Sequence, residues 1–246
     1  MSWFEHDELP CPSCGARFLG ATAETINVTR MPEMRDRILD GTFNRVVCPH
    51  CKTTAHVDRA FLYSDMTRKQ FVHVFPRTRA SDWPVWEETA LEVFRHAFDG
   101  LPGEMRDFGA GFGVRAVFGG PALADKLHLA DAGLEDAIVE LLKLELHTSQ
   151  PELRTRQDLF LDVVGVDAAA GLIEVAATGG AAPPAIYGVR LSRYEELMSR
   201  REELVEKYLG LFSRPFVGYR RLAREPLAKE LLAGIAFSET PATDGS

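Results

Sequence analysis

Alternating apolar and polar residues in the first third of the chain predict short β-strands with one helix between them. In the stretch KQFVHVF, Phe71, His73 and Phe75 fall on one face of a strand and two valines on the other. A stretch that opens with Pro32 has helical spacing, and Gly41 follows it where a C-cap glycine belongs. The predicted strands cover residues 17–28, 43–47, 54–57 and 69–75, and the helix covers residues 32–40.

From Ser81 onward, apolar residues recur mainly at helical spacing, with short strand-like stretches between the helices. The predicted helices cover residues 84–100, 122–129, 134–147 and 194–211, and the predicted strands cover residues 114–118, 159–166, 172–177 and 186–191. The order of these elements predicts an α+β fold. A small mixed α/β domain is expected first, followed by a smaller segment that holds a β-hairpin, a strand and a helix.

The composition is that of a folded chain, because 46% of the 246 residues are apolar and 26% are charged. These values exclude collagen-like and intrinsically disordered proteins. No apolar run approaches the roughly 18 residues that a membrane helix needs, and the acidic N-terminus lacks the features of a signal peptide. We therefore expect a cytoplasmic protein with reduced thiols and no membrane contact.

The net charge of −8 is distributed unevenly along the chain. Residues 80–150 hold 13 Asp and Glu against 5 Lys and Arg, whereas residues 1–79 hold 9 against 11. An acidic chain does not coat nucleic acid through its overall field. The pattern favours a protein partner that binds the acidic middle or the C-terminal surface, while the N-terminal region could still contact an acidic partner.

Four cysteines in two matching pairs are the most informative residues of the sequence. Cys11 and Cys14 lie in the motif CPSC, and Cys48 and Cys51 lie in CPHC. Two intervening residues let both thiolates of a pair turn toward one ion, and Gly15 supports the positive-φ step of such a knuckle. Four thiolates suit a structural zinc ion and leave no coordination position for substrate or water. The sequence therefore predicts one structural Zn²⁺ held by these four cysteines.

Other uses of these thiols have to be weighed beside zinc. Low-pKa cysteines in Cys-x-x-Cys motifs carry out thiol redox chemistry, but such motifs normally precede a helix, and neither pair does here. Inert buried thiols would not need two matched motifs. His50 and His56 lie close in the sequence and could replace a thiolate as ligand, although four cysteines already complete a tetrahedron.

The cysteine motifs and their surroundings resemble the CpXC domain, a family of bacterial and archaeal proteins named for two Cys-Pro-x-Cys motifs. The similarity continues through residues 25–28, 39–44, 61–66, 71–76, 115–119 and 134–146. It covers residues 9–148 and implies a zinc-ribbon-like element within a small α+β domain, without implying an activity. A C-terminal α/β segment is expected over residues 156–232, and residues 237–246 have the composition of a disordered tail.

Candidates for other chemistry are weaker. Six basic residues near the cysteines, with aromatic residues between them, could contact nucleic acid or form an ordinary solvated rim: Arg17, Arg45, Lys52, Arg59, Arg68 and Lys69. The motifs GxSxG and HExxH are absent, and no small-molecule substrate is evident. The sequence thus favours a zinc-binding, non-enzymatic interaction or regulatory module. A zinc-ribbon protein that binds nucleic acid or the transcription machinery is the first alternative, and a thiol redox protein is the second.

Overall fold

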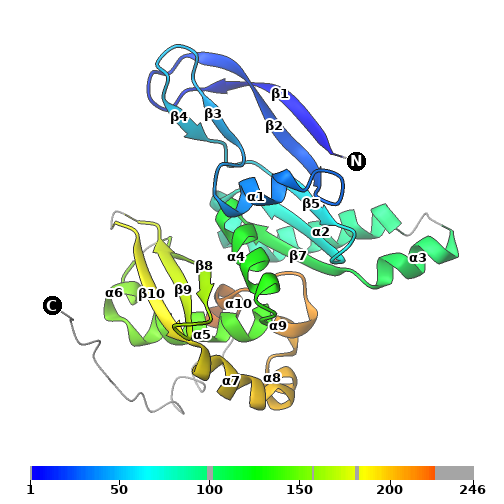
Figure 1. Cartoon of the computed structure of the whole chain (residues 1–246), viewed down its shortest axis with the longest axis vertical. Helices are drawn as coiled ribbons and strands as arrows, with labels where there is room; N and C mark the ends of the chain where they lie inside the picture. The colour runs from blue at the N-terminus through cyan, green and yellow to red at the C-terminus, as the bar shows by residue number, and fades with distance from the viewer. Residues whose placement is uncertain (1, 99–101, 157, 181–182, 225–246) are drawn as a thin grey trace.

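The computed structural model describes residues 2–98, 102–156, 158–180 and 183–224 (Figure 1). A five-stranded sheet forms its centre, in the order β1 (Trp3–Pro10), β2 (Arg17–Asn27), β5 (Phe61–Asp65), β6 (Gln70–Phe75) and β7 (Gly113–Phe118). β1 and β2 form an antiparallel hairpin, β2 pairs parallel with β5, β5 pairs antiparallel with β6, and β6 pairs parallel with β7.

Helices cover both faces of the central part of this sheet. α1 (Glu33–Leu39) and α4 (Gly120–Asp131) pack on the face that carries Val72 and Val74. The 3-10 turn η1 (Arg77–Asp82) and α2 (Trp83–Phe98) pack on the other face, where Phe71 contacts α2 and Phe75 lies 5.0 Å from the Trp86 ring. The predicted alternation in the strand at residues 69–75 is therefore confirmed.

A second small sheet stands beside the start of β2. Its strands, β3 (Arg45–Val47) and β4 (Thr54–His56), form an antiparallel hairpin in which Arg45 is paired with His56 and Val47 with Thr54. In Figure 1 this hairpin and the β1–β2 hairpin extend together from the rest of the molecule. The turns at their ends carry the two cysteine motifs.

The last third of the chain builds a separate three-stranded sheet, in the order β10 (Ala185–Arg190), β9 (Leu172–Thr178) and β8 (Phe160–Asp167). Its core includes Ile138, Leu141 and Leu142 of α5 (Asp136–Ser149), so α5 contributes to the C-terminal part of the fold. The remaining helices are α6 (Pro151–Arg154), α7 (Leu191–Ser199), α8 (Arg201–Lys207), α9 (Leu209–Ser213) and α10 (Tyr219–Arg224).

Three buried carboxylates of the acidic middle region hold the backbone of this C-terminal part. Glu87 accepts the N–H of Phe216, Asp125 accepts that of Val163, and Glu140 accepts that of Tyr219, each at 2.8 Å. The three residues are at most 3% exposed, so each bond forms away from water, where breaking it is costly. Three of the 13 acidic residues in residues 80–150 are thus used inside the molecule.

The predicted fold class is confirmed: the chain is mixed α and β, and its four N-terminal cysteines lie close together, consistent with a zinc-ribbon-like element. The single helix predicted over residues 194–211 is wrong. The backbone leaves the helical region at Arg200 and Tyr208, and the stretch divides into α7, α8 and α9. A straight helix of that length would span about 27 Å. Instead, Leu197, Leu204 and Leu211, one from each of the three short helices, are buried in the same core.

Some elements carry no clear sequence signal. β1, β5 and α3 (Gly103–Ala110) were not predicted. The predicted tail at residues 237–246 lies outside the described residues. Within the described part of the chain, no helix combines the length and the apolar character needed to cross a bilayer.

Candidate metal centre

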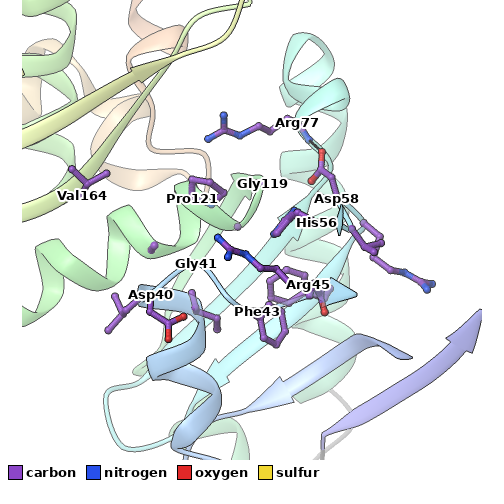
Figure 2. A pocket seen from close by; sticks show the side chains of 18 of the residues that line it. Asp40, Gly41, Phe43, Arg45, His56, Asp58, Arg77, Gly119, Pro121 and Val164 are labelled. Carbon is purple, nitrogen blue, oxygen red and sulfur yellow. Dashed lines mark hydrogen bonds between the residues drawn. The ribbon is translucent and has the colours of Figure 1, made fainter. Parts of the chain in front are cut away.

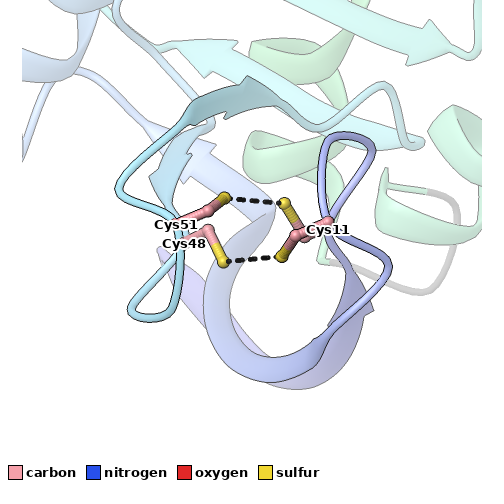
Figure 3. Close-up of side chains that lie close together, drawn as sticks. Cys11, Cys48 and Cys51 are labelled. Carbon is pink, nitrogen blue, oxygen red and sulfur yellow. Dashed lines mark hydrogen bonds between the residues drawn. The ribbon is translucent and has the colours of Figure 1, made fainter.

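The four cysteine sulfurs meet in one cluster between the two hairpin turns (Figure 3). The Sγ atoms of Cys11 and Cys51 are 3.5 Å apart, those of Cys14 and Cys48 are 3.8 Å apart, and all four lie within 4.8 Å of one another. A tetrahedron with zinc–sulfur bonds of about 2.3 Å has edges of about 3.8 Å. The sulfurs are therefore spaced as ligands of one ion, and they are too far apart to be disulfide-bonded.

The two turns that carry the cysteines have the same backbone hydrogen bonds. In the first turn, Cys11 N–H donates to Ala16 O and Gly15 N–H donates to Cys11 O, both at 2.9 Å. In the second turn, Cys48 N–H donates to Thr53 O at 3.0 Å and Lys52 N–H donates to Cys48 O at 2.9 Å. The chain thus folds back at the same offset from the first cysteine in both motifs.

Both turns also require a left-handed backbone at the residue after the second cysteine. Gly15 has φ +72° and Lys52 has φ +62°. Glycine adopts this conformation without strain, whereas a residue with a Cβ pays for it. The sequence indicated this step at Gly15, but nothing in it indicated that Lys52 takes the same conformation.

Backbone and hydroxyl donors around the sulfurs favour the thiolate form at two of the cysteines. The Cys14 N–H lowers the pKa of the Cys11 thiol, and the Thr53 hydroxyl and N–H lower the pKa of Cys51 to about 6. The Ala16 N–H acts in the same direction on Cys14, but the neighbouring thiols and burial outweigh it and raise the pKa of Cys14 to about 12. Thiolates this close repel one another unless a cation lies between them, which is the condition for a metal site.

The cluster is partly enclosed by apolar side chains. Cys11 and Cys48 are 3% and 1% exposed and pack with Phe18, Leu9 and Val46, whereas Cys14 and Cys51 reach the surface. One side of the cluster is therefore shielded from water by residues of both hairpins.

Neither histidine near the motifs joins the sulfur cluster. Among the described residues, the group that could hold a metal here consists of the four cysteines alone. His50 is exposed in its turn, and His56 lies at the base of the β3–β4 hairpin, three residues beyond the end of that turn. The four predicted cysteines are thus the residues that the fold brings together, and their binding of zinc stays a prediction.

Comparison with known proteins bears on the same region. A family model described as CpXC protein matches residues 9–143, more than half of the chain. The chain belongs to the CpXC family. No curated protein and no solved structure is matched by the chain. The matched region holds both cysteine motifs, the five-stranded sheet from β2 onward and helices α1 to α4.

The six basic residues proposed for nucleic-acid contact do not form one surface on the CpXC region. Arg17 pairs with Glu8, Arg59 with Glu5 and Asp7, and Arg68 with Asp65. Lys69 lies 2.9 Å from the centre of the Phe108 ring.

These residues are also separated along the sheet. Arg17 begins β2, next to the first cysteine turn. Arg68 and Lys69 lie in the turn after β5. This turn is near the opposite end of β2, because the Met66 N–H donates to the Thr29 hydroxyl just beyond that end. The 11 residues of β2 separate the two groups by about 33 Å. Arg45, Lys52 and Lys69 are the three of the six for which no ion pair is found in the described part of the chain.

The acidic residues of the middle region are paired in a similar way. Beyond the three buried carboxylates, four more form ion pairs with arginines, three of which lie outside residues 80–150: Asp131 with Arg35, Glu135 with Arg201, Asp136 with Arg115 and Glu145 with Arg193. This pairing removes much of the uncompensated negative charge that the sequence places in residues 80–150.

Proposed function

We propose that the chain binds one zinc ion through Cys11, Cys14, Cys48 and Cys51, and that this ion has a structural role. The observation that carries the proposal is the cluster of four sulfurs, spaced as the edges of a zinc tetrahedron, at the ends of two turns with identical backbone bonding. Four protein ligands complete the preferred coordination of zinc, so no open position is left for a water or a substrate.

The ion would join two hairpins that share little other core. One ligand pair belongs to the turn after β1 and the other to the turn after β3, and the apolar cluster around them is small. Because ligands separated by more than 30 residues meet only when the region is folded, the binding free energy of zinc is also folding free energy. The metal would therefore fix the orientation of the β3–β4 hairpin relative to β2.

We further propose that the protein acts as a non-enzymatic interaction module with a protein partner. A closed thiolate site supports scaffolding rather than catalysis. Nucleic-acid binding receives less support, because three of the six candidate basic residues are neutralised by ion pairs. Thiol redox chemistry also receives less support, because neither cysteine turn leads into a helix.

Metal analysis of the native protein tests the zinc site. We expect about one zinc per chain, loss of the metal in Cys48→Ser, and retention in Ser13→Ala, a change within the first turn that removes no sulfur. The thiols should resist alkylation until a chelator is added. Native protein without zinc, with four thiols that react freely, would contradict the site and favour the redox alternative.

Affinity capture tests the interaction module. Wild-type protein and Ser13→Ala should capture the same partner reproducibly, and Cys48→Ser should not. Turnover of a metabolite without any captured partner would count against this function. Nucleic-acid binding at low salt that weakens steeply with added salt and with charge reversal at Arg45 and Lys52 would instead support the first alternative.

A further inference from the structure

A cavity of about 520 Å³ opens at the base of the β3–β4 hairpin, away from the cysteine cluster (Figure 2). We call it the hairpin-base cavity. It lies between the end of α1, the β3–β4 hairpin, the first turns of α4 and one residue pair of β8. Its volume falls within the range of sites that hold small organic ligands.

The cavity lies where α/β folds commonly bind ligands. β6 and β7 are parallel, and their carboxyl ends lead directly into Arg77 and Gly119, which both line the cavity. α4 then begins at Gly120, so the positive end of a 12-residue helix faces the same space. Among the described residues, no acceptor is found for the Gly120 N–H.

Cationic and neutral nitrogen groups gather at this end of the cavity. Arg45 and His56 are cross-strand partners in the hairpin, so they lie on the same face of it, and Figure 2 shows the Arg45 side chain extending toward Gly119. His56 lies against the first turn of α4, since a Cβ built on Gly120 would be 3.7 Å from its Nε2. Partial burial lowers the pKa of His56, Asp58 opposes this shift, and the positive charges of Arg45 and Arg77 add to it.

The acidic residues of the cavity are occupied by internal partners, whereas Arg45 is not. Asp58 accepts the N–H of Arg77, and Asp40 accepts the N–H and hydroxyl of Thr42. No hydrogen bond or ion pair is found for the Arg45 side chain in the described part of the chain. Arg45 is therefore the charged group at the cavity that a ligand can bind without displacing a protein partner.

Apolar side chains form the rest of the wall. Ile38, Phe43 and Phe61 are at most 5% exposed and belong to the core under the sheet, and Val164 of β8 lies at the rim with 41% exposure. A ligand that fills this space would bury a hydrocarbon body against these side chains, which favours binding in proportion to the area removed from water.

We propose that the hairpin-base cavity binds a small organic anion. Its carboxylate or phosphate group lies between the Arg45 guanidinium, the His56 imidazole and the Gly120 N–H, and its apolar body lies along Ile38, Phe43 and Val164. This site is formed by other residues than the closed thiolate cluster and adds a ligand-binding function to the chain.

Calorimetric titration of the full chain with hexanoate, hexyl phosphate, inorganic phosphate and hexanol tests the proposal. We expect hexanoate or hexyl phosphate to bind at least tenfold more tightly than inorganic phosphate and hexanol. Binding of hexyl phosphate alone would identify a phosphate monoester class, and binding of hexanoate alone a carboxylate class. Failure of both to bind, or equal binding of hexanol, would overturn the proposal.

Three variants separate the site from general effects. Arg45→Gln should weaken binding of the probe at least tenfold. Arg17→Gln, which changes an exposed arginine outside the cavity, should leave the affinity unchanged. Gly120→Ala places a methyl group beside His56 at ordinary contact distance, so the variant should fold normally. Its affinity for the probe should be severalfold lower. Equal effects of Arg45→Gln and Arg17→Gln, or unchanged binding in folded Gly120→Ala, would refute the assignment.

Discussion

The matching turns around the cysteines predict opposite effects on zinc affinity for substitutions at two equivalent positions, one in each turn. Gly15→Ala introduces a Cβ into a left-handed backbone in the first turn, and Lys52→Gly removes one from the second. A Cβ on Gly15 would meet no atom within 4 Å, so its cost is conformational and not a clash. We expect Gly15→Ala to weaken the metal site and Lys52→Gly to strengthen it.

The magnitude follows from two opposing terms. A left-handed conformation costs a residue with a Cβ roughly 1–2 kcal/mol. Replacing glycine by alanine also restricts the unfolded chain, and this offsets about 0.4–1 kcal/mol of the cost. The net change is about 1 kcal/mol in each direction. If zinc binds only the folded turns, this changes its dissociation constant by about fivefold.

Competition of each variant with a chromogenic chelator measures the zinc affinity. Gly133→Ala serves as the control, because Gly133 also has positive φ and open space around a Cβ but lies at the end of α4. It should lower the melting temperature without changing the zinc affinity. Shifts of Gly15→Ala and Lys52→Gly in the same direction, or a zinc shift in Gly133→Ala, would refute the reasoning.

Other parts of the structure predict three further results. Burial lowers the pKa of His73 to about 4, so the unfolded chain binds a proton before the folded chain does as the pH falls. The free energy of unfolding should therefore drop by about 2 kcal/mol between pH 7 and pH 5. Urea denaturation should show this loss in wild type but not in His73→Phe. Glu87→Gln should lower the free energy of unfolding by about 3 kcal/mol, because the buried Arg221 and the Phe216 N–H lose a carboxylate partner. Glu88→Gln, at an exposed carboxylate, should lower it by under about 1 kcal/mol. Equal losses in the two variants would contradict this. Chelation of zinc should abolish binding at the hairpin-base cavity, because the β3–β4 hairpin carries both Cys48 and Arg45; unchanged calorimetric binding by the metal-free protein would show that the two sites are independent.

Features that depend on a few neighbouring residues were predictable. The spacing of the cysteine pairs predicts four clustered sulfurs, because each pair closes within one turn of chain. The alternation in residues 69–75 predicts a strand with two packed faces, and both faces are packed. The charged stretch at residues 194–211 shows the limit of this reasoning, since its periodicity is helical but the core bends the chain at Arg200 and Tyr208.

The use of the charged residues was not predictable in the same way. The sequence places an excess of acid in residues 80–150, yet Glu87, Asp125 and Glu140 lie inside the fold and bind backbone groups far along the chain. Arg59 looks like an exposed cation in the sequence, but the pairing of β1 with β2 brings Glu5 and Asp7 to it. Which charges are free depends on the strand pairing.

The sequence by itself thus determined the metal-binding motifs and most secondary-structure elements, because local spacing and side-chain type set their geometry. Only the tertiary structure decided that His56 faces a cavity and not the sulfurs, and that Arg45 beside it has no ion pair with any described residue. The cavity is built from α1, the β3–β4 hairpin, α4 and β8, which lie more than 100 residues apart at the extremes. No local pattern encodes their meeting, since it results from the packing of helices against strands that belong to three different sheets.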